Sequence, residues 1–163
     1  MESHQRKNMK TLILLLPLFS THTFAVTLEV VGPCSETAVI EVEYDISDLS
    51  QSVGFYSVEM FTAFDIPFLG TDGGMNSIIN TPTGKKAIEK ISETKMRAHG
   101  WCYQVDGFEP AAMTNNYFFP TKTSHLRWVF GYSTFDGDIF TGIGEWTGYC
   151  DPTYAVKPAQ FCQ

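Results

Sequence analysis

The chain has 163 residues, with 11 Lys and Arg against 18 Asp and Glu, so its formal net charge is −7. This balance argues against nucleic acid as a partner, because such binding depends on neutralising phosphates with a basic surface. It disfavours anionic membranes for the same reason. Acidic surfaces also keep exported proteins soluble, and this is the simplest interpretation of the charge.

Residues 1–25 have the features of a secretory signal peptide. Three basic residues precede the apolar run Leu12–Phe19, and small residues lead to an expected cleavage point after Ala25. The run is far shorter than the ~20 residues that cross a bilayer, so we expect no membrane span. The leader holds three of the basic residues and one acidic residue, so the mature chain, 26–163, has a net charge of about −9. Its length fits one domain.

Four cysteines follow the leader: Cys34, Cys102, Cys150 and Cys162. An even number in a small exported domain predicts two disulfides, and the three possible pairings stay open. Zinc is the competing interpretation. It is disfavoured because no Cys-x-x-Cys pair exists and only His99 and His125 could assist. We therefore assign no metal and no cofactor.

The mature chain begins with two predicted strands. Val26–Cys34 is apolar and stops at Gly-Pro. Thr37–Asp45 alternates between apolar and acidic residues, which indicates a sheet with one face toward solvent. The run Phe55–Phe68 then predicts a helix, with Ser52 or Ser57 as its N-cap and Pro67 as its stop. We expect the aromatic residues of this helix to belong to the core.

The next segments are less regular. Gly70–Lys86 is rich in turn residues, but it lacks the Gly-Lys-Ser/Thr ending of a phosphate-binding loop. Ala87–Met96 fits either a helical turn or an extended segment, and we favour the extended one. Asp136-Gly137-Asp138 could offer oxygen ligands to calcium, yet the same tripeptide is a common turn.

The segment GWCYQVDGFEP, Gly100–Pro110, predicts an aromatic strand that ends in an Asp-Gly turn. Its expected partner is His125–Tyr132, which alternates in the same way. We expect the two strands to lie side by side with their rings packed under the helix. Cys102 would face away from that core, and we expect a disulfide there to hold the irregular segment Tyr149–Cys162.

These motifs resemble a known family. The helix YSVEMFTAFDIPF, the segment GGMNSII and the strands WCYQVDG and LRWVFGY are similar to the C-terminal β-domain of transcobalamin and intrinsic factor. They resemble more closely the standalone bacterial relatives classed as a domain of unknown function. The resemblance covers roughly Ser52–Phe135, and Trp-x-Tyr-x-Val-Asp/Asn-Gly is its most specific part.

The resemblance implies an α+β fold, a β-grasp-like mixed sheet packed on one helix, here stapled by disulfides. The domain 26–163 would add N-terminal strands and a cysteine-bearing tail to it. In the vitamin carriers this domain closes over cobalamin that a large helical domain holds. We expect no helical partner within the mature chain, so cobalamin binding is not carried over as an activity of the chain alone.

No catalytic motif stands out. There is no Gly-x-Ser-x-Gly elbow, and an even cysteine count leaves no free thiol nucleophile. We expect His99 to lie just before its strand and His125 at the start of the next, both as surface or strand-end residues. The sequence therefore favours a protein that is not an enzyme.

The aromatic content is high at 14%, and a domain this small cannot bury every ring. Exposed rings favour recognition. The candidate surface is formed by Phe108, Tyr117, Phe118 and Trp146.

We therefore expect an exported, periplasmic or secreted, non-enzymatic module that binds a protein or a small ligand. One alternative is a cobalamin-like ligand bound together with a separate partner chain. Another is a secreted hydrolase whose site is not recognised.

Overall fold

The computed structural model describes residues 24–121 and 124–162. Its strands are β1 (Phe24–Val31), β2 (Ile40–Ile46), β3 (Phe68–Thr71), β4 (Gly74–Ile78), β5 (Ile88–Lys90), β6 (Lys95–Val105), β7 (Ser124–Asp138) and β8 (Ile143–Pro152). One α-helix, α1 (Val53–Ala63), and three short 3-10 turns, η1 (Gly84–Ala87), η2 (Thr114–Asn116) and η3 (Thr153–Ala155), complete the described chain. The expected leader lies outside the described residues, apart from Phe24 and Ala25, which begin β1.

A mixed sheet organises the molecule. Its strand order is β2-β1-β7-β6-β5, and β8 adds to β7. The β1–β7 pair is parallel and the other pairs are antiparallel. With one helix packed on this sheet, the fold is α+β, as the sequence predicts.

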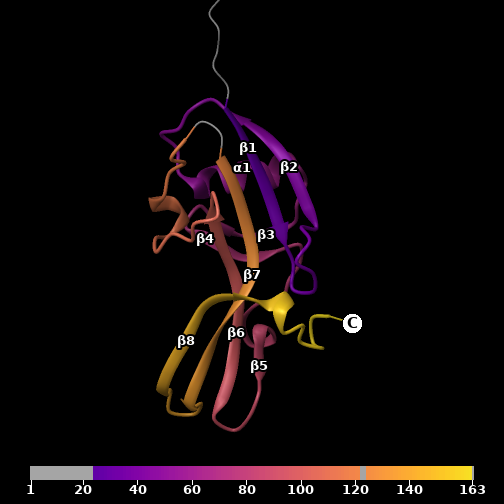
Figure 1. The fold of residues 1–163 in the computed structure, drawn as a ribbon, viewed down its shortest axis with the longest axis vertical. Coiled ribbons are helices and arrows are strands. Elements are labelled where there is room, and N and C mark those ends of the chain that lie inside the picture. The colour runs from indigo at the N-terminus through magenta and orange to yellow at the C-terminus, as the bar shows by residue number, and fades with distance from the viewer. Residues whose placement is uncertain (1–23, 122–123, 163) are drawn as a thin grey trace, which may run out of the picture.

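The strand β7 spans two parts of the molecule (Figure 1). Its first residues pair with β1, from Ser124 to Val129, and its later residues pair with β8, from Gly131 to Asp138. We call β5, β8 and the halves of β6 and β7 that pair with them the arm. In Figure 1 the arm extends below the part that holds β1, β2 and α1.

The two aromatic strands lie side by side, as predicted. In the register of β6 and β7, Trp101 faces Phe130 and Tyr103 faces Trp128. The Phe61 ring of α1 packs 6.2 Å from the Trp128 ring, so the rings lie under the helix. Burial of these large rings supplies much of the hydrophobic stabilisation.

The helix α1 is shorter than the predicted span. Ser52 is its N-cap, and its side chain accepts a hydrogen bond from the Phe55 backbone N–H at 3.1 Å. Ser57, the other candidate cap, is buried instead; its hydroxyl accepts from Trp128 Nε1 at 3.2 Å and donates to the Val53 carbonyl. The helix therefore gains a cap at its start and a polar anchor to the sheet.

The segment Gly70–Lys86 contains more regular structure than its turn residues indicate. The strands β3 and β4 form a two-stranded antiparallel hairpin that turns at Asp72-Gly73. After η1, the chain enters β5 in an extended conformation, which confirms the interpretation favoured for Ala87–Met96. The turn at Asp106-Gly107 is also confirmed, since both residues have positive φ and Val105 bridges Phe108.

The two disulfides join Cys34 to Cys162 and Cys102 to Cys150. The second holds the C-terminal segment against β6, as expected. That segment begins more regularly than the sequence indicates, because Tyr149 and Cys150 still belong to β8. The first disulfide joins the segment that follows β1 to the end of the chain, so the tail is covalently fixed at two points.

Candidate functional site

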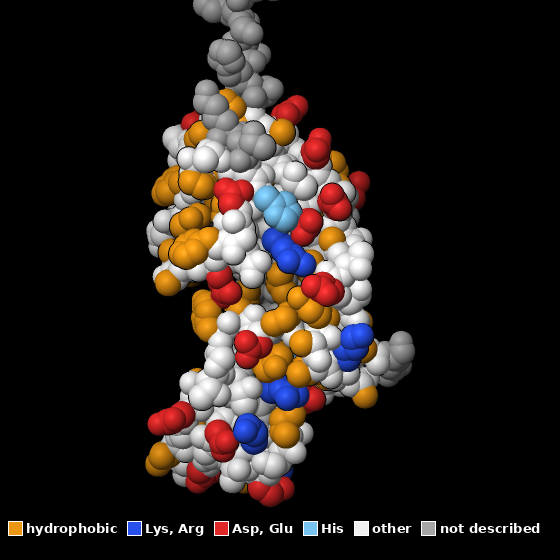
Figure 2. Space-filling view, in the orientation of Figure 1, with side chains coloured by type: hydrophobic (Ala, Val, Ile, Leu, Met, Phe, Trp, Pro, Cys, Tyr) orange, Lys and Arg blue, Asp and Glu red, His pale blue; other side chains and the backbone are white. Residues whose placement is uncertain are grey.

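An open cleft of about 790 Å³ lies where the β3–β4 hairpin, the strand β6 and the segment 109–114 meet. The side chains that line it are mainly apolar or aromatic: Met75, Trp101, Tyr103, Pro110, Ala111, Ala112, Met113, Trp128 and Tyr149. Among the described residues that line it, Glu109 is the single carboxylate. In Figure 2 the left margin is hollowed between the upper part and the arm, and hydrophobic side chains gather above the hollow.

The walls of the cleft meet at the backbone carbonyl of Asp72, in the β3–β4 turn. The Thr114 hydroxyl donates a hydrogen bond to this oxygen at 2.6 Å, which ties η2 to the hairpin. Gly54, in the first turn of α1, also lies against it, because a Cβ built on Gly54 would stand 1.7 Å from the same oxygen. Three segments that are far apart in sequence thus share one contact point.

Two rings on β6 are fixed by hydrogen bonds. Trp101 Nε1 donates to Thr81 Oγ1 at 2.7 Å, and the Tyr103 hydroxyl donates to the Ala112 carbonyl at 2.7 Å. The second bond attaches the segment 109–114 to β6. Burial raises the pKa of Tyr103 to about 12, so this hydroxyl stays a donor across the physiological range.

Glu109 has no compensating partner in the described part of the chain. Its Oε1 atom is shielded from solvent and has no hydrogen-bond partner there. Desolvation by burial is the main cause that raises the pKa of Glu109, and the nearby charge of Asp151 raises it further. Buried polar atoms in folded proteins are nearly always paired, so an unpaired carboxylate oxygen in a cleft needs an explanation.

Glu109 lies beside the second disulfide. Its carboxylate oxygen and the sulfur atoms of Cys102 and Cys150 all lie within 4.8 Å of one another. Thiolates and a carboxylate at this spacing could bind a metal ion. In this structure the two sulfurs are bonded to each other, so they do not offer the thiolates that a metal requires.

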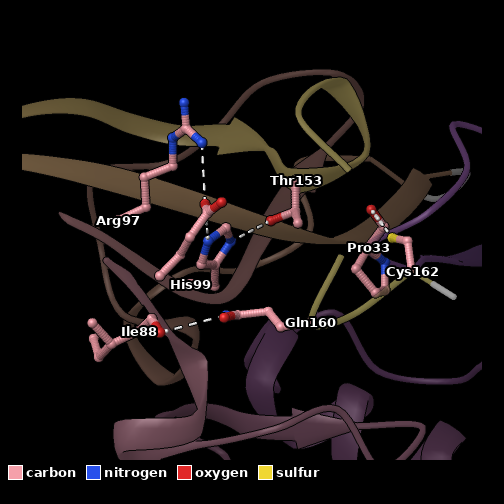
Figure 3. Close-up of polar contacts among 8 residues, drawn as sticks. Pro33, Ile88, Arg97, His99, Thr153, Gln160 and Cys162 are labelled. Atoms are coloured by element: carbon pink, nitrogen blue, oxygen red, sulfur yellow. Dashed lines mark hydrogen bonds and ion pairs between the residues drawn. The ribbon is translucent and has the colours of Figure 1, made fainter. Parts of the chain in front are cut away.

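The second polar cluster surrounds His99 and corrects the sequence prediction for that residue. His99 lies within β6 and is buried, with 8% of its surface exposed, where we expected a surface or strand-end position. Its Nδ1 lies 2.9 Å from Thr153 Oγ1, and its Nε2 lies 3.4 Å from Glu89 Oε2 (Figure 3). The Phe161 ring packs on the imidazole at 4.8 Å. The C-terminal tail is what buries this histidine.

A carboxylate, an imidazole and a hydroxyl in a row have the components of a nucleophilic triad. Here the hydroxyl belongs to Thr153, which has no exposed surface, and a substrate could not approach it. Burial lowers the pKa of His99 more than its hydrogen bond to the Glu89 carboxylate raises it. The geometry therefore fixes the tail onto the sheet and leaves no room for chemistry at Thr153.

None of the four aromatic residues that the sequence nominates lines the cleft. Phe108, Phe118 and Trp146 are exposed by 61%, 49% and 54%. Tyr117 is half-buried, and its ring packs 6.2 Å from that of Tyr103. Phe118 bridges Ser52 at the start of α1, while Trp146 pairs with Phe135 in the arm. Phe118 and Trp146 thus lie in different parts of the fold.

Three residues of the cleft, Glu109, Met113 and Tyr149, are not among those that the sequence predicts. One signal for Glu109 was present, since it is a lone acid inside the apolar run Phe108–Met113.

His125 is placed as expected, one residue after the start of β7, and its Nε2 lies 3.2 Å from Glu29 Oε1. At Asp136–Asp138, the Asp138 carboxylate accepts from the backbone N–H groups of Phe140 and Thr141, which is turn geometry.

Comparisons with known proteins name no family. No family model matches the chain, and no curated protein matches it. Among solved structures, it is similar to a protein from Ruminococcus gnavus ATCC 29149 described as a "putative metal binding protein". The identity is 10%, the TM-score is 0.38, and the match covers 67% of this chain and 99% of that chain. Within the described residues, no helix has the length and apolar character needed to cross a membrane.

Proposed function

We propose that the protein is an exported binding module that takes a small ligand in the cleft between β6, the β3–β4 hairpin and the segment 109–114. The observation that carries this proposal is the cleft itself: an open volume of about 790 Å³ with two fixed rings and one carboxylate. Ligand sites in proteins are concave, mostly apolar and supplied with a few polar groups, with volumes of roughly 300–1,000 Å³.

The two disulfides support the exported part of the proposal. Such bonds persist in oxidising compartments, which include the periplasm and the extracellular space. Cys102 lines the cleft and is bonded to Cys150 on β8, the strand that also contributes Tyr149. The Cys102–Cys150 disulfide therefore holds one wall of the proposed site. Because this bond persists in an oxidising compartment, the intact cleft fits an exported protein.

Ligand binding can be tested by filling the cleft. Ala111 lines the cleft and is exposed, so Ala111→Trp should occupy it without disturbing the core. A fragment library screened by ligand-observed NMR should give binders to the wild type that Ala111→Trp loses. Ala155→Trp, at an exposed position on η3, is the matched control and should keep them. If no fragment distinguishes the wild type from Ala111→Trp, the proposal fails.

A second candidate is a cobalamin-like ligand that the chain binds together with a separate partner chain. Its support is the resemblance of Ser52–Phe135 to the vitamin carriers, in which a β-grasp-like domain closes over the ligand. The exposed rim also supports it, because Phe108 and Met113 are each 61% exposed next to the cleft. Visible spectra of the purified protein with cobalamin, alone and with envelope extract, would test this candidate; a spectrum identical to that of free cobalamin in both samples would oppose it.

A further inference from the structure

We infer that the cleft binds a small organic cation, an ammonium group carried on an apolar or aromatic body, with Glu109 as its counter-ion. This inference rests on the proposed function and adds the chemical class of the ligand. It depends on three features of the cleft as its described residues form it: a carboxylate without a partner, a lining without basic residues, and aromatic rings whose polar groups are already used.

The unpaired carboxylate is the first feature. Glu109 Oε1 is shielded from solvent and, among the described residues, accepts no hydrogen bond; the residue also forms no ion pair there. Burying a charge without a partner is costly, and the cost is removed when an opposite charge or a donor arrives. A cationic group placed beside Glu109 would supply the opposite charge, and a cation that carries N–H groups would supply a donor as well.

The charge around the carboxylate is the second feature. Among the described residues that line the cleft there is no Lys, Arg or His. Asp151, on β8, lies close enough to act on Glu109, and it adds a second negative charge. An anion would be repelled from this site, and a neutral ligand would leave the negative charge of the carboxylate uncompensated even if it donated a hydrogen bond. Charge complementarity therefore selects a cation.

The aromatic rings are the third feature. Trp101 and Tyr103 line the cleft, and their N–H and O–H groups donate to Thr81 and to Ala112 respectively. Trp128 also lines the cleft, and Tyr149, 72% exposed, contributes a fourth ring. With their polar groups occupied, the first two rings offer the ligand π surface, which attracts cations, and Met75 and Met113 add polarisable apolar surface.

The size of the site favours a small molecule. A volume of about 790 Å³ accommodates one ring and an ammonium group with room for a further substituent. The carboxylate lies next to Cys102, one of the lining residues, so the ammonium group would bind toward the disulfide and the apolar body toward Met113. In this orientation the carboxylate faces the positive charge of the ligand, and the apolar surface of the cleft faces the apolar body.

Isothermal titration calorimetry with three probes of the same ring and different charge tests the inference: benzyltrimethylammonium, benzyl alcohol and phenylacetate. We expect one site per chain that binds benzyltrimethylammonium most tightly and phenylacetate not at all. Glu109→Gln should weaken the binding of the cation about ten-fold or more, because the attraction between the carboxylate and the positive charge is lost. Glu145→Gln, at an exposed position on β8, removes the same charge outside the cleft and should leave the affinity unchanged.

The outcomes separate this inference from the proposed function. If benzyl alcohol binds as tightly as the cation, or if Glu109→Gln binds the cation like the wild type, the inference is overturned. The cleft would remain a ligand site in that case, provided that Ala111→Trp still abolishes binding of the alcohol. If benzyltrimethylammonium produces no heat at its highest usable concentration, the inference is also overturned, and the fragment screen then decides the proposed function alone. Circular dichroism of Glu109→Gln confirms that the variant is folded.

Discussion

The hydroxyl of Thr114 donates a hydrogen bond of 2.6 Å to the backbone carbonyl of Asp72, and this contact joins the segment 109–114 to the β3–β4 hairpin. The two residues are 42 positions apart in the chain. Both segments line the cleft, so its width depends on whether this contact forms. It is the most direct structural link between the stability of the fold and the proposed site.

Thr114→Val removes the hydroxyl while keeping the shape of the side chain. The Asp72 carbonyl then loses a donor in a part-buried position, and we expect a loss of about 1 kcal/mol in the free energy of unfolding. We also expect weaker binding of any ligand of the cleft, because the segment 109–114 is released. Urea unfolding and calorimetry measure both effects. Thr62→Val, at an exposed hydroxyl on α1, is the control, and equal effects in both variants would contradict the prediction.

Gly54→Ala is expected to destabilise the fold although alanine favours helices. In an exposed helix the change would stabilise by about 1 kcal/mol. Here the new Cβ would stand 1.7 Å from the Asp72 carbonyl oxygen, so α1 or the hairpin must move. We expect a net loss of about 1–3 kcal/mol, the usual cost of overpacking.

Gly32→Ala provides the matched comparison for Gly54→Ala. Its Cβ would meet Ile79 at an ordinary distance of 3.6 Å, and no clash is expected. Thermal unfolding of the two variants should therefore separate them clearly. A Gly54→Ala protein as stable as the wild type would show that α1 and the β3–β4 turn are not in close contact.

The two disulfides should have different consequences for the cleft. Replacing either pair by alanine should cost about 2–5 kcal/mol of stability. Only the pair Cys102–Cys150 holds β8 against β6 beside Glu109, so only its loss should also reduce binding of benzyltrimethylammonium. The pair Cys34–Cys162 is the control. Calorimetry of the two double variants, at a temperature where both are folded, makes the comparison; equal affinities would contradict the assignment of the cleft wall.

Acid should destabilise the protein through His99. Burial lowers the pKa of His99 in the folded state below its ordinary value of 6.5, so the unfolded chain binds a proton more readily. The contribution of His99 to the free energy of unfolding is therefore fully present above about pH 6.5. It is lost as the pH falls from there through the lower pKa of the folded state. Glu89 and Arg97 also act on the imidazole, and their effects are smaller than that of burial.

Urea unfolding between pH 8 and pH 5, about the interval over which a histidine titrates, tests this window. His99→Gln should show a smaller fall in stability with acid than the wild type, although it is less stable at neutral pH. His125→Gln is the control, because His125 is only partly buried and pairs with Glu29 at the surface. A wild-type slope retained in His99→Gln would show that another group carries the acid sensitivity.

Glu109 should affect stability in the opposite direction. Burial and Asp151 raise the pKa of Glu109 in the folded state above 4.5, so the folded chain binds this proton more readily. The contribution of Glu109 is therefore unfavourable at neutral pH and is relieved as the pH falls through the raised pKa. Glu109→Gln should stabilise the protein at pH 7 by about 0.5 kcal/mol or less, since the residue is partly exposed and screened.

Strand pairing was the part of the fold best predicted from sequence. The alternation in Gly100–Pro110 and His125–Tyr132 identified the two strands, and the facing of Trp101 and Phe130 follows from it. The strand β8 was missed for a physical reason. All but two of its residues are exposed, so no buried face imposes an alternating pattern on its sequence.

The candidate site was predicted poorly because it is assembled by long-range contacts. His99 was expected at the surface, yet it is buried by Thr153 and Phe161, which are more than fifty residues away in the chain. The cleft forms where Thr114 meets Asp72, and no local pattern encodes that contact. Glu109 differed from its neighbours only by being a lone acid in an apolar run.

Chemical-shift mapping with benzyltrimethylammonium tests the central claim most directly, because it shows where the cation binds. In ¹⁵N-labelled protein we predict the largest shifts at the backbone amides of Glu109 and Met113 and at the indole N–H of Trp101. The indole N–H of Trp146, in the arm, should not move. Largest shifts at Trp146, or equal shifts in Glu109→Gln and in the wild type, would contradict the account.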